Sequence, residues 1–421
     1  MAEKLVLAYS GGLDTSVAVR WLTERGYEVI ALTADLGVDP NRATGEKRAL
    51  AAGAVAYHCI DARDDFIRYF AFPALAAGAV YQGRYPLATA LARPLIAKLL
   101  VDIARQEGAQ AVAHGCTGKG NDQVRFDVSV QALAPDLRIV APVREWELRT
   151  REQEIDYAKK HKIPVPVTKE SPYSIDENLW GRSVEAGVLE DPWLEPPEDA
   201  FAWTQPVAKT PDEPQYIEIA FERGLPVSLD GKEIDGVALV QRLNELGGEH
   251  GVGRIDHLED RLVGIKSREI YEAPAAVTLL RAHAALEQMT LSRAQLRLKS
   301  TLAQEYAALI YDGLWFTAHH QDLASYVQST QRHVSGAVRM RLHKGQATTV
   351  GTQAPRSLYA LGLATYDKGE QYDQSAAEGF IHIWGLPVRV QAQAQLLAQP
   401  GDPLHIALRA EPQDEASPEE E

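Results

Sequence analysis

The feature that most constrains this 421-residue chain is the string Ser10-Gly-Gly-Leu-Asp-Thr-Ser16, which lies between an apolar β-prone run and a helical pattern. Adjacent glycines let a backbone turn tightly and approach an anion, and the following helix offers unpaired N–H groups at its positive end. The string lacks the lysine of a GxxxxGK[ST] loop and the third glycine of GxGxxG, which excludes a γ-phosphate-transferring loop and a dinucleotide fingerprint. We therefore predict a loop that binds pyrophosphate as a leaving group. The alternative is a plain strand-to-helix turn with Asp14 or Thr15 as N-cap.

Strand-like and helix-like segments alternate through the first 165 residues. Strands are predicted at 5–9, 28–33, 54–60, 109–114 and 139–142, and helices at 14–25, 42–52, 87–106 and 150–161. This alternation is typical of a parallel α/β sheet, and it predicts a Rossmann-like nucleotide-binding domain. Asp35 ends the second strand, where it could meet a ribose or adenine or could be an ordinary turn acid.

The pattern changes after Ile163-Pro-Val-Pro166, where Pro-rich connectors begin. Strands are predicted at 216–221 and 226–229, helices at 235–246, 273–288, 292–311 and 321–331, and an antiparallel pair at 336–351 around Lys344-Gly345. We therefore predict a nucleotide-binding domain at 1–165, an α+β domain at 166–400 and an acidic tail at 401–421. The last eleven residues carry six acids and no base, a composition typical of disorder.

Charge and cysteine content exclude several classes of protein. The chain has 43 Lys and Arg against 58 Asp and Glu, a net charge of −15, whereas nucleic-acid binders need cations that displace counterions from phosphates. Its two cysteines, Cys59 and Cys116, cannot build a disulfide framework or a cysteine-based zinc site. No stretch reaches the roughly 18 apolar residues of a membrane span, and the first apolar run is too short for a secretory signal. We predict a cytoplasmic protein that binds neither nucleic acid nor membranes.

A second glycine-rich segment, HGCTGKGNDQVRF, spans residues 114–126 and follows an apolar strand. Ligands of open α/β sheets lie at the carboxyl ends of the strands. A zwitterionic amino acid needs a fork of hydrogen-bond donors for its carboxylate and acceptors for its ammonium group. Arg125, together with Asp122 and the Asn121 amide, supplies both types. We predict an amino-acid site here. The alternative is a solvated loop with a surface Asp–Arg pair.

These segments resemble known signatures. The string at 8–16 resembles that of the PP-loop ATP pyrophosphatases, which cleave ATP to AMP and pyrophosphate. Together with 114–126, 171–183, 189–193 and 264–272, it resembles the argininosuccinate synthase family over about residues 4–390. The resemblance implies a ligase of arginine biosynthesis that condenses citrulline and aspartate to argininosuccinate through a citrullyl-adenylate, releasing AMP and pyrophosphate. It also implies Mg²⁺ bound with ATP rather than by assigned side chains, and a homotetramer assembled through the second, synthetase and multimerisation domain.

The resemblance also implies three sets of binding residues. ATP would contact Ala8, Tyr9, Ser10, Gly11, Gly12, Leu13, Asp14, Thr15, Ser16, Ala34 and Gly115. Aspartate would contact Thr117, Asn121 and Asp122. Citrulline would contact Tyr85, Asn121, Arg125, Ser174, Ser183, Glu259 and Tyr271. The amine proton of aspartate would pass to Asp122 or to a phosphate oxygen, and the sequence does not choose between them.

Two residues depart from the family pattern. Ala90 replaces a serine that contacts citrulline, so either Thr89 compensates or a hydrogen bond is lost, and Val38 stands where a glutamine is common. His114 and Lys299 are interpreted as a packed strand-end residue and part of a solvated helix face.

Two other functions remain open. A tRNA-modifying PP-loop enzyme would share the first string, but it needs a basic RNA-binding face and often a persulfide cysteine. A catalytically silent nucleotide sensor would not need the string from Asn121 to Arg125.

Overall fold

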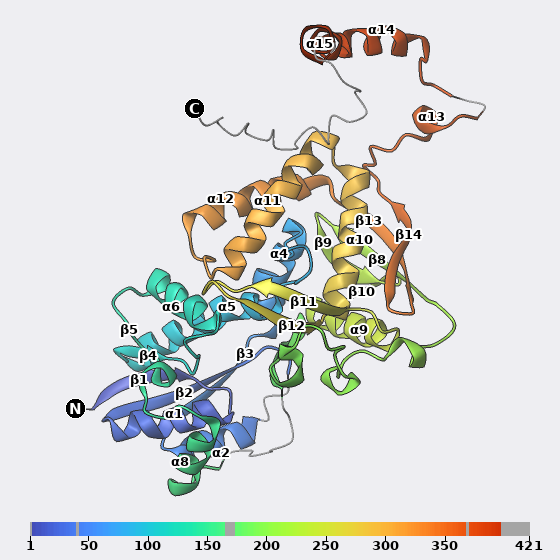
Figure 1. The fold of residues 1–421 in the computed structure, drawn as a ribbon. Coiled ribbons are helices and arrows are strands. Elements are labelled where there is room, and N and C mark those ends of the chain that lie inside the picture. The colour runs from blue at the N-terminus through green and yellow to red at the C-terminus, as the bar shows by residue number, and fades with distance from the viewer. Residues whose placement is uncertain (1, 39–41, 165–172, 368–369, 397–421) are drawn as a thin grey trace, which may run out of the picture. The chain divides into compact units, whose positions relative to one another are not determined.

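A parallel sheet of five strands organises the N-terminal part of the computed structural model, which describes residues 2–38, 42–164, 173–367 and 370–396 (Figure 1). Its strands are β1 (Glu3–Ala8), β2 (Tyr27–Asp35), β3 (Ala56–Asp61), β4 (Ala111–Ala113) and β5 (Arg138–Val140). They lie in the order β3-β2-β1-β4-β5, and every neighbouring pair is parallel. The predicted α/β nucleotide-binding fold is therefore confirmed.

Helices cover both faces of this sheet. Leu5 and Leu7 of β1 pack into one apolar cluster with α1 (Leu13–Glu24), α2 (Arg42–Ala52) and α8 (Arg151–Lys160). Val6, which points the other way, packs into a second cluster with α5 (Ala88–Glu107) and α6 (Asp122–Leu133). Because successive side chains of a strand point to opposite faces, strands covered on both sides must be apolar at nearly every position.

The strand order places two loops side by side. The chain runs from β1 through β2 to β3 on one side and returns to β4 on the other side of β1. Ligands of open α/β sheets bind at such a reversal, outside the carboxyl ends of the strands. The loops that follow β1 and β4 contain the two glycine-rich strings.

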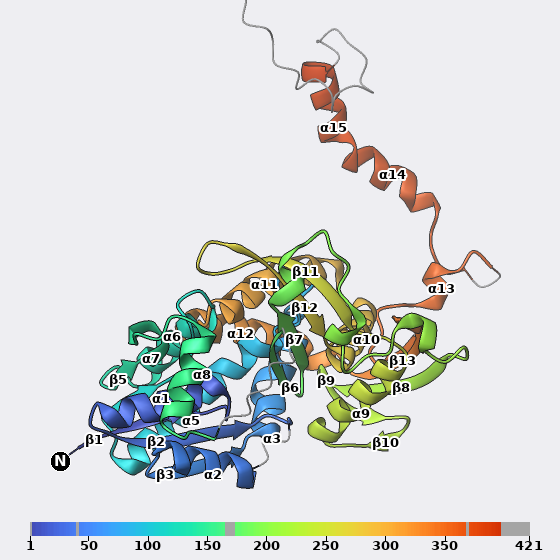
Figure 2. The same cartoon turned by 60° about the horizontal axis from the view of Figure 1, so that its bottom comes forward.

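Two antiparallel sheets follow in the chain. The first has the order β11-β12-β7-β6 and consists of β6 (Ser174–Asn178), β7 (Gly181–Glu185), β11 (Arg254–Asp260) and β12 (Lys266–Glu272). The second has the order β10-β9-β8-β13-β14 and consists of β8 (Gln215–Glu222), β9 (Leu225–Leu229), β10 (Lys232–Glu233), β13 (Gly336–His343) and β14 (Gln346–Gln353). Helices α9 (Gly236–Glu249) and α10 (Pro274–Thr290) lie beside the second sheet (Figure 2). The predicted hairpin between β13 and β14 turns at Lys344 and Gly345, which both have positive φ, as a tight hairpin turn requires.

The structure describes several further helices. They are α3 (Arg63–Phe66), α4 (Phe72–Ala77), α7 (Pro142–Glu145), α11 (Arg293–Tyr311), α12 (Ala318–Thr330), α13 (Leu361–Ala364), α14 (Ser375–Trp384) and α15 (Leu386–Gln391). Short 3₁₀ or π turns occupy Ile67–Ala71, Gly187–Glu190, Glu198–Ala200, Val207–Lys209, Gln331–His333 and Ala392–Leu396. Within the described ranges, no helix is long and apolar enough to cross a membrane.

The contacts divide the chain into two units, Met1–Leu358 and Tyr359–Glu421. The predicted domain boundary near residue 165 and the predicted acidic tail at 401–421 both lie outside the described residues. The parallel sheet and its helices all precede the boundary, and both antiparallel sheets follow it. The boundary itself stays a prediction.

Candidate functional site

The first glycine-rich string forms a loop whose helix has no side-chain cap. α1 begins at Leu13 with Gly12 as N-cap, which has no side chain to cap the first turn, and the Gly12 amide donates a hydrogen bond of 3.4 Å to Ser10 Oγ. The alternative in which Asp14 or Thr15 caps the helix is therefore wrong. Gly11 has φ +78°, a conformation that favours glycine. An uncapped helix start after a glycine turn leaves backbone N–H groups for an anion.

Hydroxyl groups of this loop bond one another. Ser10 Oγ lies 3.1 Å from Thr15 Oγ1, and Tyr9 Oη lies 3.0 Å from Ser16 Oγ. The Thr33 hydroxyl donates a hydrogen bond of 2.7 Å to the main-chain oxygen of Tyr9, which ties the loop to β2. These bonds hold the loop in shape next to the end of the sheet.

The two glycine-rich loops touch. A Cβ on Gly115 would lie only 3.0 Å from Thr15 Cγ2, closer than most real contacts, so glycine lets the loops pack this closely. A cavity of about 420 Å³ opens between them and β2. Its lining includes the predicted ATP residues Ala8, Tyr9, Ser10, Thr15, Ala34 and Gly115. The remaining predicted ATP residues form the turn and the first helical turn of α1.

The far end of this cavity holds Val38, where the family often has glutamine. The Asp35 carboxylate accepts a hydrogen bond of 2.9 Å from the Gly37 amide and lies 4.0 Å from Arg63 Nε. Asp35 therefore stabilises the turn after β2 in this structure.

An acid of α8, Glu154, lies near Asp14 at the start of α1. Burial, together with the nearby charge of Asp14, raises the pKa of Glu154 to about 8. One oxygen of Glu154 is buried without a hydrogen-bond partner. Burial and the charge of Asp14 thus favour the neutral form of Glu154.

Arg93 on α5 lies between the cavity lined by predicted ATP residues and the predicted amino-acid site at Asp122. Its Nη2 lies 2.7 Å from Asp122 Oδ2 and also pairs with Asp176 of β6. Its Nε is buried without a partner, and the side chain lines the 420 Å³ cavity. Although burial alone would raise it, the guanidinium groups of Arg93 and Arg125 hold the pKa of Asp122 below its ordinary value. Asp122 is therefore a carboxylate in a fixed position.

Arg125 is buried with one nitrogen left open. Its Nη1 donates to Asp122 Oδ1 at 2.9 Å, and its Nε donates to the main-chain oxygen of Tyr311 at 2.8 Å. Nη2 is buried and has no partner. The alternative of a solvated loop with a surface Asp–Arg pair is therefore wrong, since the arginine is only 3% exposed. A buried, unpartnered guanidinium nitrogen is what an anionic ligand group would satisfy.

Most of the residues predicted to bind citrulline lie together. The Tyr85 and Tyr271 rings stack with centroids 4.1 Å apart. Tyr271 donates a hydrogen bond of 2.6 Å to Glu259, which is 2% exposed. Glu259 connects in turn to Asn121 through the hydroxyl of Tyr311. These contacts bring a helix, a loop and the β11–β12 hairpin to one site.

The hydroxyl side of this site lies on β7. Ser183 Oγ lies 3.3 Å from Thr89 Oγ1, and the Thr89 amide donates to the Tyr85 hydroxyl. Ala90 belongs to the apolar core and is fully buried, so the hydroxyl of Thr89 is the one beside Ser183. Ser174 is exposed at the start of β6, on the same strand face as Asp176, and the contacts above do not include it.

The other predicted residues of the second loop differ in exposure. Thr117 lies exposed in a turn, while Asn121 is buried. His114 is 2% exposed, with its Nε2 2.8 Å from Asp127 and its Nδ1 accepting from the Cys116 amide. The packed strand-end interpretation of His114 is therefore confirmed.

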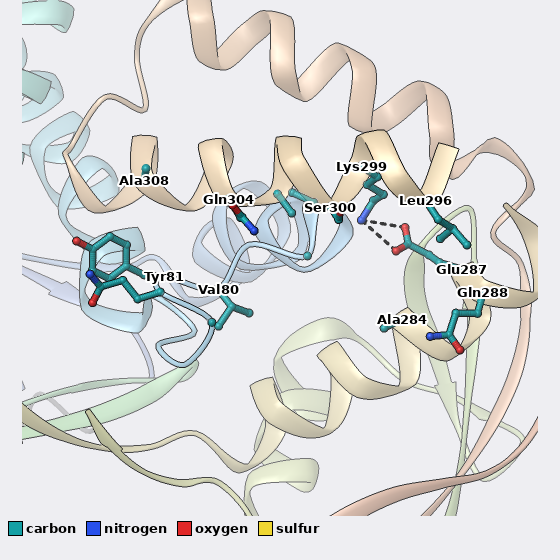
Figure 3. A pocket seen from close by; sticks show the side chains of 15 residues that line it. Val80, Tyr81, Ala284, Glu287, Gln288, Leu296, Lys299, Ser300, Gln304 and Ala308 are labelled. Atoms are coloured by element: carbon teal, nitrogen blue, oxygen red, sulfur yellow. Dashed lines mark hydrogen bonds and ion pairs between the residues drawn. The ribbon is translucent and has the colours of Figure 1, made fainter. Parts of the chain in front are cut away.

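The position of Lys299 differs from the prediction. It was predicted on a solvated helix face, yet it is 4% exposed and lies 3.0 Å from Glu287 of α10. Figure 3 shows this pair at one end of a cavity of about 820 Å³, with Tyr81 at the other end. The helical spacing placed Lys299 on a polar face, but α10 covers that face and supplies a counter-charge.

Sequence reasoning missed Arg93, Asp176 and Tyr311 as site residues. Arg93 lies within an alanine-rich stretch that reads as helix packing, and its charge among apolar neighbours was the available signal. Tyr311 is 190 residues from Asn121, and nothing local connects them.

The chain matches two family models. "Arginosuccinate synthase N-terminal HUP domain" covers residues 4–164, and "Arginosuccinate synthase C-terminal domain" covers residues 173–391. Its relatives include the argininosuccinate synthases of Dehalococcoides mccartyi, 57% identical over 94% of this chain and 97% of the relative, and of Gloeobacter violaceus, 58% identical over 94% and 99%. The enzyme of Rubrobacter xylanophilus is 58% identical over 92% and 94%. A solved 4-thiouridine synthetase–RNA complex with bound ATP covers 38% of this chain and 40% of its own at 16% identity and a TM-score of 0.27, a likeness too slight to bear on function.

Proposed function

Since this chain belongs to the argininosuccinate synthase family, we propose that its site divides into an ATP side at the first loop and an amino-acid side at the second. The protein is an ATP-dependent ligase that condenses citrulline and aspartate to argininosuccinate, releasing AMP and pyrophosphate. The main support for this division is the contact between Gly115 and Thr15. It places the start of α1 next to the loop that leads to Arg125.

The chemistry needs this adjacency. A ureido group is a poor electrophile because nitrogen lone pairs delocalise into its carbonyl. Attack of the ureido oxygen on the α-phosphorus of ATP forms the adenylate and expels pyrophosphate, which we place at Gly11 and Gly12. The aspartate amine then displaces AMP. Positioning and charge stabilisation supply most of such catalysis.

We propose the following division of contacts. ATP is held by residues 8–16, Ala34 and Gly115, and aspartate is held by Thr117, Asn121 and Asp122. Citrulline is held by Tyr85, Asn121, Arg125, Ser174, Ser183, Glu259 and Tyr271. The low pKa of Asp122 makes it a weak base, which favours a phosphate oxygen as the acceptor of the amine proton and an ammonium-binding role for Asp122.

We propose that Mg²⁺ enters as part of the MgATP substrate. Among the described residues, no group of three or more His, Cys, Asp and Glu is arranged to hold a metal. Phosphate oxygens and waters would then supply most of the ligands, since Mg²⁺ usually keeps several waters.

Two further properties are proposed from composition and chemistry. The excess of acids and the two unpaired cysteines support a cytoplasmic protein without nucleic-acid partners. Burial raises the pKa of the Cys116 thiol, which opposes the reactive cysteine that a tRNA-thiolating enzyme often uses.

The products test this function. We expect pyrophosphate release to depend on citrulline, and AMP rather than ADP to accumulate when aspartate is present. The reason is that the first loop binds pyrophosphate and lacks the γ-phosphate lysine. Coupled pyrophosphate detection and nucleotide chromatography, with each amino acid omitted in turn, measure this. ADP as the main product, or turnover without citrulline, would contradict the proposal.

We also propose a homotetramer that uses the second unit as an interface. Its helices α14 and α15 expose large apolar side chains, with Phe380, Ile381, Ile383 and Trp384 each more than 60% exposed. Apolar side chains gathered in this way mark protein–protein contacts.

A charge on this surface should dissociate the assembly. We expect the double variant Ile383→Glu, Trp384→Glu to shift the mass found by light scattering from four chains to fewer, because a carboxylate cannot be buried unpaired. Val207→Glu, at an exposed apolar residue of the first unit, is the control and should leave the mass unchanged. A double variant that keeps the wild-type mass would exclude α14 from the interface.

A further inference from the structure

Tyr311 ends α11 and lies buried among polar side chains that the proposed function uses. It is 1% exposed, and it contacts Asn121, Arg125 and Glu259. These three side chains come from a loop, a helix and a strand. A role for Tyr311 in this site rests on the proposed function of these neighbours.

The hydroxyl of Tyr311 is the middle of a directed chain of hydrogen bonds. The Leu262 amide donates to Asn121 Oδ1 at 2.9 Å, which fixes the orientation of the side-chain amide. Asn121 Nδ2 then donates to the Tyr311 oxygen at 2.8 Å, and Tyr311 donates to Glu259 Oε1 at 2.5 Å. The other oxygen of Glu259 accepts from Tyr271. Burial, together with the carboxylate of Glu259, raises the pKa of Tyr311, so its hydroxyl stays a donor.

The backbone and ring of Tyr311 direct Arg125. The main-chain oxygen of Tyr311 takes the Arg125 Nε–H, and the guanidinium carbon lies 4.7 Å from the centroid of the ring. The chain then turns at Gly313, which has φ +78° and where a Cβ would lie 2.7 Å from Arg125 Cα. With Nε and Nη1 occupied, Nη2 is the nitrogen left for a ligand.

The ring of Tyr311 is itself held in plane. Tyr81 stacks on it with centroids 3.6 Å apart and planes 5° from parallel. The Tyr81 hydroxyl donates a hydrogen bond of 2.8 Å to the main-chain oxygen of Asp260, one residue from Glu259. Tyr81 also forms one end of the cavity in Figure 3.

We propose that Tyr311 is a positioning residue for citrulline binding. The hydroxyl of Tyr311 orients Asn121 and Glu259, and its main-chain carbonyl orients Arg125. These three side chains would contact different ends of the citrulline molecule, so their positions relative to one another determine how well citrulline binds. ATP is bound at the other loop and does not depend on this chain of bonds.

The test is Tyr311→Phe, which keeps the ring stack and removes the hydroxyl. We expect the KM for citrulline to rise on the order of 10- to 100-fold, because Asn121 and Glu259 each lose a buried partner, while the KM for ATP stays within about twofold. Tyr306→Phe is a matched control on the same helix. Tyr306 is also 1% exposed, and its hydroxyl lies 2.7 Å from His320 Nε2, outside the site.

The possible outcomes distinguish a failure of the positioning role from a failure of the proposed function. Wild-type protein that releases no pyrophosphate with citrulline would remove the proposed function. Active wild type with an unchanged citrulline KM in Tyr311→Phe, or with equal rises in both tyrosine variants, would overturn the positioning role. If Tyr311→Phe does not fold, Tyr81→Leu releases the ring from the other side, and it should raise the citrulline KM severalfold and spare ATP. An unchanged citrulline KM in Tyr81→Leu would likewise overturn the role.

Discussion

Replacing Arg125 with lysine is expected to lower kcat/KM for citrulline roughly 100-fold, which corresponds to about 2.7 kcal/mol. The positive charge survives the substitution. The substitution removes the planar guanidinium, whose Nε donates to Tyr311, whose Nη1 donates to Asp122 and whose Nη2 is left without a partner. A lysine ammonium cannot reproduce these directions.

Steady-state kinetics with each substrate varied in turn measure the effect. Binding of ATP alone should barely change, because the contacts of Arg125 with Tyr311 and Asp122 do not involve the first loop. Arg138→Lys is the control, since Arg138 is exposed and pairs with Glu3 at the surface. A variant that lost ATP affinity and kept the wild-type citrulline KM would assign Arg125 to the nucleotide instead.

Replacing Glu272 with alanine is expected to lower the free energy of unfolding by about 3–5 kcal/mol. Glu272 is fully buried at the end of β12. One oxygen accepts from the amides of Trp203 and Thr204 and from the Thr204 hydroxyl. The other accepts from the Ala202 amide and from Arg182 at 2.8 Å. Alanine would leave a buried guanidinium without its main counter-charge and three amides without acceptors.

Urea unfolding followed by circular dichroism measures this loss. Glu198→Ala is the control. Glu198 pairs with Arg254, but its side chain is 61% exposed, so its loss should cost less than about 1 kcal/mol. A Glu272→Ala protein as stable as the control would show that the chain from Ala202 to Thr204 finds other partners.

Several parts of the fold followed from local sequence. The strands β1 and β2 were predicted from their apolar runs, which are typical of strands covered on both faces, and this pattern needs no knowledge of neighbouring strands. The predicted helix at 150–161 begins with a capping box between Thr150 and Gln153, which are close enough in sequence to form it without help from the rest of the fold. The hairpin at Lys344 and Gly345 is local for the same reason.

The antiparallel sheet of β6, β7, β11 and β12 was not predicted, although it holds four of the seven residues proposed to bind citrulline: Ser174, Ser183, Glu259 and Tyr271. Its strands β11 and β12 read RIDHLED and KSREIYE, which are mostly charged. Arg268, Glu269 and Glu272 are nevertheless buried. A buried charge is stable only when a partner from elsewhere in the chain meets it, so local hydrophobic periodicity cannot mark such strands.

Local sequence was enough to predict the two glycine loops, the strand that each loop follows and the residue types suited to a phosphate and an amino acid. Those properties depend on turns, helix starts and side-chain chemistry within about ten residues. Only the tertiary structure decided that Tyr311 joins Asn121 to Glu259, that Arg93 bridges Asp122 and Asp176, and that Lys299 is buried against Glu287. Each of these contacts forms when packed elements distant in sequence bury polar groups together, because a buried polar group must find its partner wherever the fold supplies one.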